Sequence, residues 1–158
     1  MFLQRLVISL LLCSGLYSVA LAQARPGAAA LKPCSLLTRE LALKANPKQT
    51  LDAGRPTEVS LGANGAACEW GDLMLSVDPY TPARLEEIRK KDGKQWEAIS
   101  GVGDAAYLHN VKDAMGELFV RVGSRTFVVL ITIPADSTVT AFKPNFVMVA
   151  NAVVPKLR

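Results

Sequence analysis

The sequence predicts an α+β domain with a mostly antiparallel sheet of about five to seven strands and an N-terminal, a middle and a C-terminal helix. Short apolar stretches with period-two alternation are separated by turns too tight for a helical crossover, which indicates antiparallel neighbours. Three other segments repeat apolar residues at three- and four-residue spacing, as helices do. Their order predicts helices packed on a sheet.

Ordered structure is expected to begin at Pro33-Cys34, followed by a short helix that carries Leu36, Leu37 and Leu41. Ser35 and Thr38 are both candidate N-caps, and Pro47 ends the helix because proline disfavours helical geometry in the preceding residue. Asn64-Gly65 is typical of a hairpin turn and separates the first two of three short strands. These strands are expected at residues 58–61, 67–70 and 73–77.

The middle helix is expected at residues 82–91, after Thr81 as its N-cap and before Gly93 as its end. Four more strands are expected at residues 96–99, 104–108, 115–122 and 126–133. The last strand is apolar at both parities, which predicts a central strand covered on both faces. The C-terminal helix is expected at residues 137–157, with Pro144 either opening or kinking it. Its apolar stripe comprises Phe146, Val149, Val153 and Leu157.

Residues 1–22 have the pattern of a secretory signal peptide. Arg5 precedes a nearly unbroken apolar run, and this run ends in Ala20-Leu21-Ala22, with small residues at both positions that signal peptidase reads. We expect cleavage after Ala22, or alternatively after Ala24. The mature chain would then have a flexible leader at residues 23–32 and a single domain at residues 33–158.

Two alternatives to cleavage remain open. The apolar run is at the lower limit for spanning a bilayer, so it could be retained as an anchor. Cys13 could be lipidated, although Leu12 stands where that processing prefers a small residue. Export would place the mature domain in the periplasm or outside the cell.

Cysteine content supports export. Loss of residues 1–22 leaves Cys34 and Cys68, an even pair in an oxidising compartment. A redox-active pair usually has C-x-x-C spacing, which this pair lacks. We therefore expect a structural disulfide that stabilises the fold by about 3–4 kcal/mol.

Charge patterning argues against nucleic acid as a partner. The formal net charge of +4 falls to +3 when Arg5 is removed with the signal peptide. The densest basic cluster, Arg89-Lys90-Lys91, follows Glu86 and Glu87, which indicates a solvated helix face.

The residue types needed for cofactor or metal chemistry are sparse. Gly101-x-Gly103-x-x-Ala106 fits a dinucleotide fingerprint, but poor helix formers follow it, so we interpret it as a glycine-rich turn. His109 is the only histidine and is expected to lie on the surface beside a turn. A zinc site requires three or four ligands, and no G-x-S-x-G motif accompanies the histidine. We therefore expect no cofactor and no metal.

Acidic residues give the main route to an enzymatic function. Two carboxylates facing each other could hydrolyse a glycosidic bond, although aspartates at turns commonly bond the nearby backbone instead. The candidates are Asp72, Asp78, Asp104 and Asp113. Trp70, Trp96 and Tyr107 could line a binding cleft, but Trp70 shares a strand face with Cys68 and is expected to pack in the core.

Three motifs in this order resemble a domain-of-unknown-function family of small cell-envelope proteins, known chiefly from actinobacterial lipoproteins. They are Pro33-Cys34-Ser35-Leu36-Leu37-Thr38, Cys68-Glu69-Trp70 and Gly101-Val102-Gly103-Asp104-Ala105-Ala106-Tyr107. The resemblance covers nearly the whole mature chain and implies a disulfide between the two cysteines. It implies no catalytic residue. The chain departs from the family in lacking a lipidation cysteine after its apolar run, which favours an unanchored form.

We therefore expect an exported, non-enzymatic binding or accessory module of the cell envelope, with an envelope protein or a small ligand as its partner. Loops on a firm scaffold commonly carry recognition, which makes Asp104, Tyr107 and Tyr80 the candidate binding residues. An inhibitor or immunity protein of an envelope hydrolase is the alternative. A carboxylate-dependent hydrolase is the third possibility.

Overall fold

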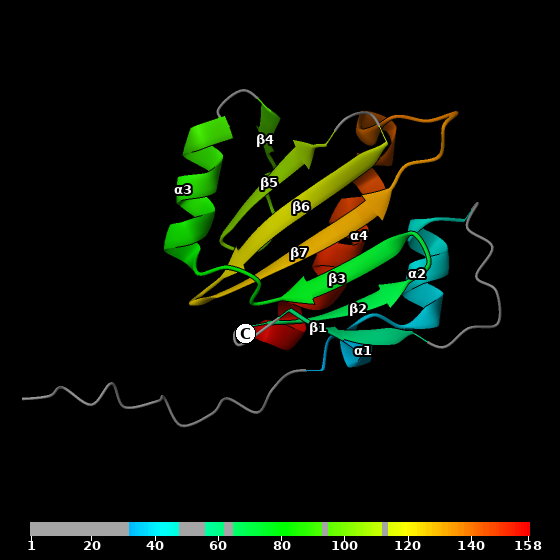
Figure 1. Cartoon of the computed structure of the whole chain (residues 1–158), viewed down its shortest axis with the longest axis horizontal. Coiled ribbons are helices and arrows are strands. Elements are labelled where there is room, and N and C mark those ends of the chain that lie inside the picture. The colour runs from blue at the N-terminus through cyan, green and yellow to red at the C-terminus, as the bar shows by residue number, and fades with distance from the viewer. Residues whose placement is uncertain (1–31, 48–55, 62–64, 93–94, 112–113) are drawn as a thin grey trace, which may run out of the picture.

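A computed structural model describes residues 32–47, 56–61, 65–92, 95–111 and 114–158. Seven strands form one fully antiparallel sheet in the order β1-β2-β3-β7-β6-β5-β4, which confirms the predicted α+β class (Figure 1). The strands are β1 (Thr57–Ser60), β2 (Ala66–Trp70), β3 (Leu73–Val77), β4 (Trp96–Ala98), β5 (Ala105–Asn110), β6 (Met115–Val122) and β7 (Arg125–Thr132). The predicted signal peptide lies outside the described residues, as does the leader except for Lys32.

The predicted N-terminal helix is divided into two. The helices are α1 (Pro33–Leu36), α2 (Arg39–Ala45), α3 (Pro82–Asp92) and α4 (Val139–Leu157). Leu37 is extended between the first two, and the Thr38 side chain accepts a hydrogen bond from the amide of Leu41 as the N-cap of α2. Ser35 instead bonds the carbonyl of Lys32 from within α1. Both candidate caps are therefore used locally, but only Thr38 starts a helix by capping it.

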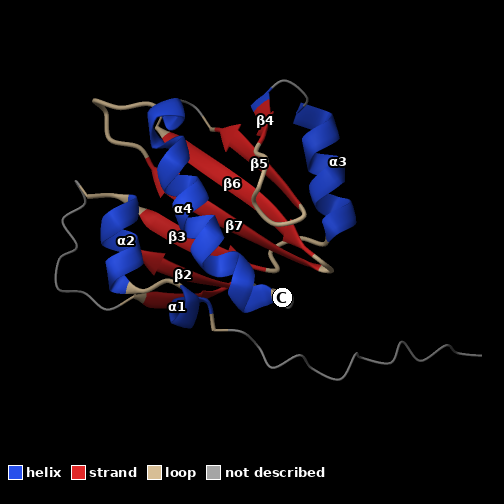
Figure 2. Ribbon diagram, turned by 180° about the vertical axis from the view of Figure 1, so that it is seen from behind, coloured by secondary structure: helices blue, strands red, loops and turns tan. Residues whose placement is uncertain are grey.

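The two faces of the sheet differ in what covers them. Figure 2 shows α1, α2 and α4 lying across one face, which we call the covered face, while Figure 1 shows the opposite, open face with α3 at its margin. Strand side chains on the covered face, such as Leu75, Leu118 and Val129, are fully buried. Every residue of the predicted stripe on α4 is buried here as well.

Close packing holds α4 against the sheet. A Cβ added at Gly116 of β6 would lie 2.6 Å from Cζ of Phe146, so glycine is needed for the helix to approach the strand this closely. The Phe146 side chain is completely buried. Pro144 lies inside α4 rather than opening it, because the helix begins at Val139 after the N-cap Thr138.

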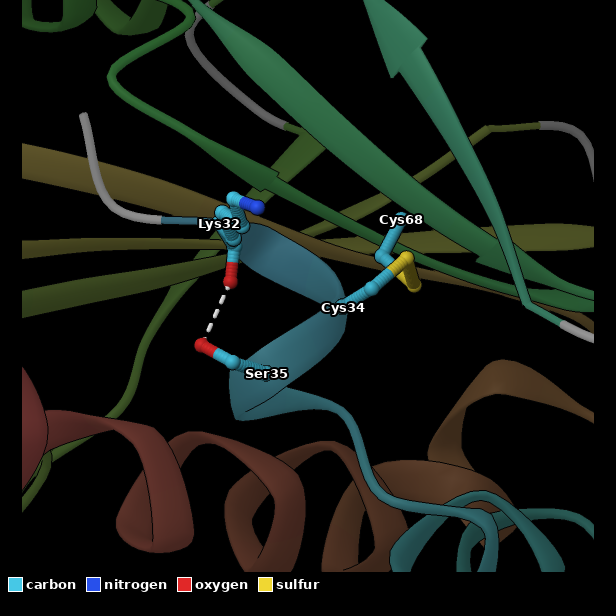
Figure 3. The surroundings of a disulfide bond; sticks show 4 residues. All are labelled: Lys32, Cys34, Ser35 and Cys68. Carbon is cyan, nitrogen blue, oxygen red and sulfur yellow. Dashed lines mark hydrogen bonds between the residues drawn. A yellow bond between two sulfur atoms is a disulfide. The ribbon is translucent and has the colours of Figure 1, made fainter.

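A disulfide fastens α1 to the sheet on the covered side. Cys34 and Cys68 are joined in the predicted pair, with their Cα atoms 4.9 Å apart (Figure 3). Cys68 is fully buried, and Trp70, two residues further along β2, packs partly buried against the same core. The disulfide therefore extends the core to the N-terminal segment.

Strand register aligns the residues of the open face in rows that run across the strands. The row through Phe119 comprises Val59, Ala67, Ser76, Val128, Phe119, Tyr107 and Ala98. The row through Glu117 comprises Thr57, Glu69, Met74, Leu130, Glu117, His109 and Trp96. Each row crosses all seven strands from edge to edge.

The prediction that the last strand is covered on both faces is correct only for its first half. Toward the open face, Val128 of β7 is buried, Leu130 is half-buried and Thr132 is exposed. The second half of β7 therefore has apolar surface on the open face that the rest of the chain covers only in part.

Candidate functional site

The α3 corner of the open face is closed by apolar and aromatic packing. Leu85 of α3 is buried in a small cluster with Phe119 of β6 and Val128 of β7. The ring of Trp96 lies 4.8 Å from that of Phe119 at 56°, and the ring of Tyr80 stacks on Phe119 at 6.1 Å. This cluster attaches α3 and the short edge strand β4 to the sheet.

His109 belongs to this closed corner, so the expectation of a surface side chain is wrong, although the residue does lie near the turn between β5 and β6. Strand β5 runs through it to Asn110, and its side chain is 14% exposed. Its ring stacks on that of Trp96 at 4.5 Å with planes 9° apart. The register causes this contact, since Trp96 and Glu117 flank His109 on the two neighbouring strands.

Both nitrogens of the His109 ring are engaged by oxygens of the fold. Nδ1 lies 3.4 Å from Oε2 of Glu117, and Nε2 lies 3.1 Å from Oε1 of Gln95. A general base needs a ring nitrogen directed at the proton that it abstracts. The His109 ring therefore packs on Trp96 and bridges Glu117 and Gln95.

Tyr107 is also engaged at this corner. The guanidinium of Arg89 lies over its ring, 4.8 Å from the centroid, in cation–π geometry. Arg89 in turn donates hydrogen bonds to Glu86, whose hydrogen bonding and negative charge raise the pKa of the guanidinium above its ordinary value. Of the two tyrosines predicted to bind, Tyr80 is the exposed residue, at 40%.

Asp104 organises a turn. Its carboxylate accepts a 2.6 Å hydrogen bond from the amide of Gly123, and its own amide donates to the carbonyl of Arg121. The preceding Gly103 has a positive φ of 58°, and a Cβ there would lie 2.5 Å from the Arg121 carbonyl oxygen. Strand β5 follows, so this glycine motif joins a turn to a strand and lacks the helix that a dinucleotide site requires.

Asp78 contacts the other side of the hairpin between β6 and β7, whose turn contains Gly123. Its carboxylate accepts hydrogen bonds from the Arg125 side chain, with Nε 3.0 Å away, and from the amide of Thr126 at 3.1 Å. Its positive φ of 52° is held by this network. Asp72 is exposed in the turn between β2 and β3, and Asp113 lies outside the described residues. The two described acids nearest the hairpin thus bond backbone and arginine in the way that turn residues do.

The three aromatic residues considered for a cleft do not share one face of the sheet. Trp96 and Tyr107 are on the open face and already pack against other rings or a guanidinium. Trp70 packs against the core on the covered face, as the shared parity with Cys68 predicted. These rings therefore form no common platform for a ligand.

Away from α3, the open face carries apolar side chains that its own chain leaves partly uncovered. Met74 and Leu130 are register partners on β3 and β7 and are half-buried, as is Met115 on β6. We call these three residues the apolar strip. A sheet face that only water covers is usually polar, so the strip is the feature that marks a candidate binding surface.

Carboxylates border the apolar strip on both sides. In the row through Glu117, Glu69 lies one strand beyond Met74 and is exposed, while Glu117 lies one strand beyond Leu130 and is 25% exposed. Within the described part of the chain, Glu69 makes no ion pair or side-chain hydrogen bond. Sequence reasoning missed both glutamates and the strip, because only the register brings them into one row.

Comparisons with known proteins add no family. The chain matches no protein-family model, and neither the curated proteins nor the solved structures contain a significant match. The resemblance to the lipoprotein family therefore stays a prediction that rests on its three motifs. Among the described residues, no cluster of three or more His, Cys, Asp or Glu could hold a metal ion, and no helix is long and apolar enough to cross a membrane.

Proposed function

We propose that the protein is an exported, non-enzymatic binding or accessory module of the cell envelope, and that it binds its partner with the apolar strip of the open face. The observation that carries the proposal is the register pair Met74 and Leu130, which is half-buried on the sheet face where α3, at one corner, is the only helix among the described residues. Burying apolar surface is the main driving force of protein association.

The proposed location outside the cytoplasm rests on two independent features. The disulfide between Cys34 and Cys68 is of a kind that forms and persists in oxidising compartments. Residues 1–22 have the charge, the apolar run and the small-residue end of a signal peptide. Together they favour a periplasmic or secreted protein.

A binding role, rather than a hydrolytic one, is supported by the engagement of the candidate acids. Asp78 and Asp104 each accept backbone hydrogen bonds at the hairpin between β6 and β7. Glycosidases need a carboxylate pair that faces a shared space for substrate. Alanine replacement of Asp78 or Asp104 would therefore remove hydrogen bonds that hold the turn.

Inhibition of an envelope hydrolase is the second candidate, favoured by Tyr80. This side chain is exposed, while its backbone carbonyl accepts a hydrogen bond from the hydroxyl of Thr126 and its ring rests on Phe119. A fixed, exposed aromatic side chain suits insertion into a cleft. Tyr80→Ala should abolish inhibition of a cell-wall hydrolase panel by the protein, and a wild-type protein that inhibits none of the enzymes would rule this role out.

Affinity capture with surface variants tests the main proposal. Oxidised protein is immobilised, and proteins retained from an envelope extract are identified by mass spectrometry for the wild type, Thr132→Lys and Glu58→Lys. Thr132 is exposed on the open face beside Met115, and Glu58 is exposed on the opposite face. We expect one stoichiometric protein that Thr132→Lys loses and Glu58→Lys keeps. Equal retention by all three proteins would place the binding surface elsewhere.

A further inference from the structure

We propose that the apolar strip docks a basic amphipathic helix of a partner protein, with lysine or arginine on both sides of the helix's apolar stripe. This inference rests on the proposed function and names the kind of partner. The juxtaposition that carries it is an apolar pair, Met74 and Leu130, placed between two carboxylates, Glu69 and Glu117, in one row across the sheet.

The three residues of the apolar strip are arranged so that one helix could lie across them. Met74 and Leu130 sit on adjacent strands, and Met115 is the diagonal neighbour of Leu130, because Met115 pairs with Thr132 and Glu117 pairs with Leu130. All three residues are half-buried. The apolar stripe of a surface helix covers such a patch with residues three and four apart.

The spacing of the carboxylates fits the width of a helix. Glu69 and Glu117 stand on β2 and β6, three strand spacings apart across β3 and β7, which is roughly 14 Å. A helix with its side chains is roughly 10–12 Å wide, so bases on its two flanks would reach both acids. An acid that already has an internal partner gains less from a new one, and Glu69 has none within the described residues.

The charge around the apolar strip is opposite in sign to the net charge of the whole molecule. The formal net charge of the chain is +4, yet the ionisable residues in the row through Glu117 are Glu69, Glu117 and His109. Asp72, at the adjacent end of β2 and β3, is a further exposed acid. Complementary charge across an interface raises the association rate and selects the partner.

The same charges disfavour the other occupants. Two copies packed face to face would place their glutamates against each other, which is unfavourable for like charges. Anionic lipid surfaces attract basic segments, and the charged residues that border this strip, Glu69 and Glu117, are acidic. An added strand needs a free sheet edge, whereas the strip lies in the middle of the sheet, and the covered face shows that a helix packs on this sheet through α4.

Two synthetic peptides test the inference. Each is a stapled helix of roughly 15 residues with a leucine stripe, flanked by lysines in one peptide and by glutamates at the same positions in its twin. Fluorescence anisotropy measures their affinity for the purified, oxidised protein. We expect the lysine peptide to bind at least about tenfold more tightly, with affinity falling as salt is raised from about 0.05 to about 0.5 M.

Matched charge reversals locate the effect. Glu69→Lys should weaken binding of the lysine peptide about two- to fivefold for the ion pair that it removes. Glu58→Lys makes the same charge change on the neighbouring strand and the opposite face, and should have almost no effect. Thr132→Lys, at an exposed position of the open face, should weaken binding without disturbing the core.

The outcomes separate this inference from the proposed function. Equal affinity of the two peptides, or equal effects of Glu69→Lys and Glu58→Lys, overturns the basic-helix partner. If that happens while Thr132→Lys still loses its captured protein, the binding surface stands and the partner has another chemistry. Concentration-dependent dimerisation that Glu69→Lys strengthens would assign the strip to a second copy and also overturn the inference.

Discussion

The two faces of the sheet are covered to different extents, and β7 contributes side chains to both. Its side chains Phe127, Val129 and Ile131 point into the covered face and are completely buried. The alternate side chains Val128, Leu130 and Thr132 point to the open face, and their exposure increases along the strand. The same backbone therefore supplies a filled core on one side and a partly uncovered apolar surface on the other.

We propose that this difference separates stability from recognition. The covered face has a disulfide and three helices, of which α4 approaches the sheet as closely as a glycine allows. The open face has one helix, attached through Leu85 at a corner, and leaves Met74, Leu130 and Met115 half-buried. A protein can change an open face of this kind without losing its core.

The largest expected effect is on the covered face. Phe146→Ala should destabilise the protein by about 3–5 kcal/mol, because it leaves a cavity between α4 and β6 that the close packing at Gly116 cannot fill. Urea unfolding measures the free energy. The matched open-face variant Met74→Ala should cost less than about 1 kcal/mol, since its side chain is only half-buried. Equal losses would show that the two faces do not differ in this way.

Loss of the disulfide comes next. The double variant Cys34→Ala/Cys68→Ala should lose about 3–4 kcal/mol, since the bond closes a loop with a sequence separation of 34 residues. Circular dichroism during thermal unfolding would show a lower midpoint, and wild-type protein under reducing conditions should match the variant. A variant as stable as oxidised wild type would mean that the covered face does not depend on this link.

A smaller effect is expected at the corner where α3 is attached. Leu85→Ala should cost about 2 kcal/mol, because this side chain is the buried contact of α3 with Phe119 and Val128. Hydrogen exchange should show faster exchange of α3 amides while α4 amides stay protected. Uniform acceleration in both helices would indicate that α3 belongs to the same cooperative unit as the covered face.

Much of the fold was predictable from local patterns. Period-two alternation in Met115–Val122 identified the residues facing the core, and the stripe on the last helix is buried as expected. The division of the first helix was not predicted, because Ser35 and Thr38 both have cap chemistry and sequence does not show which one the backbone uses. Alternation also assigns residues to faces without telling whether a helix covers a face.

The candidate site was less predictable, for a related reason. His109 contacts Trp96 and Glu117 through the strand register, and these contacts join residues up to 13 positions apart, which the local sequence around the histidine does not reveal. Asp104 was a candidate acid and a candidate binding residue, and its hydrogen bond from the amide of Gly123 gives it a structural role in the turn. The one sequence feature that indicated the apolar strip was the presence of apolar residues at both parities in β7.

The most direct test of the difference between the faces is the urea unfolding free energy of Leu130→Lys compared with that of wild type. A lysine at a half-buried strand position can extend its charged end into water, so we predict a change within about 0.5 kcal/mol. A loss of more than about 2 kcal/mol would show that Leu130 belongs to the core and would contradict the assignment of the open face to binding.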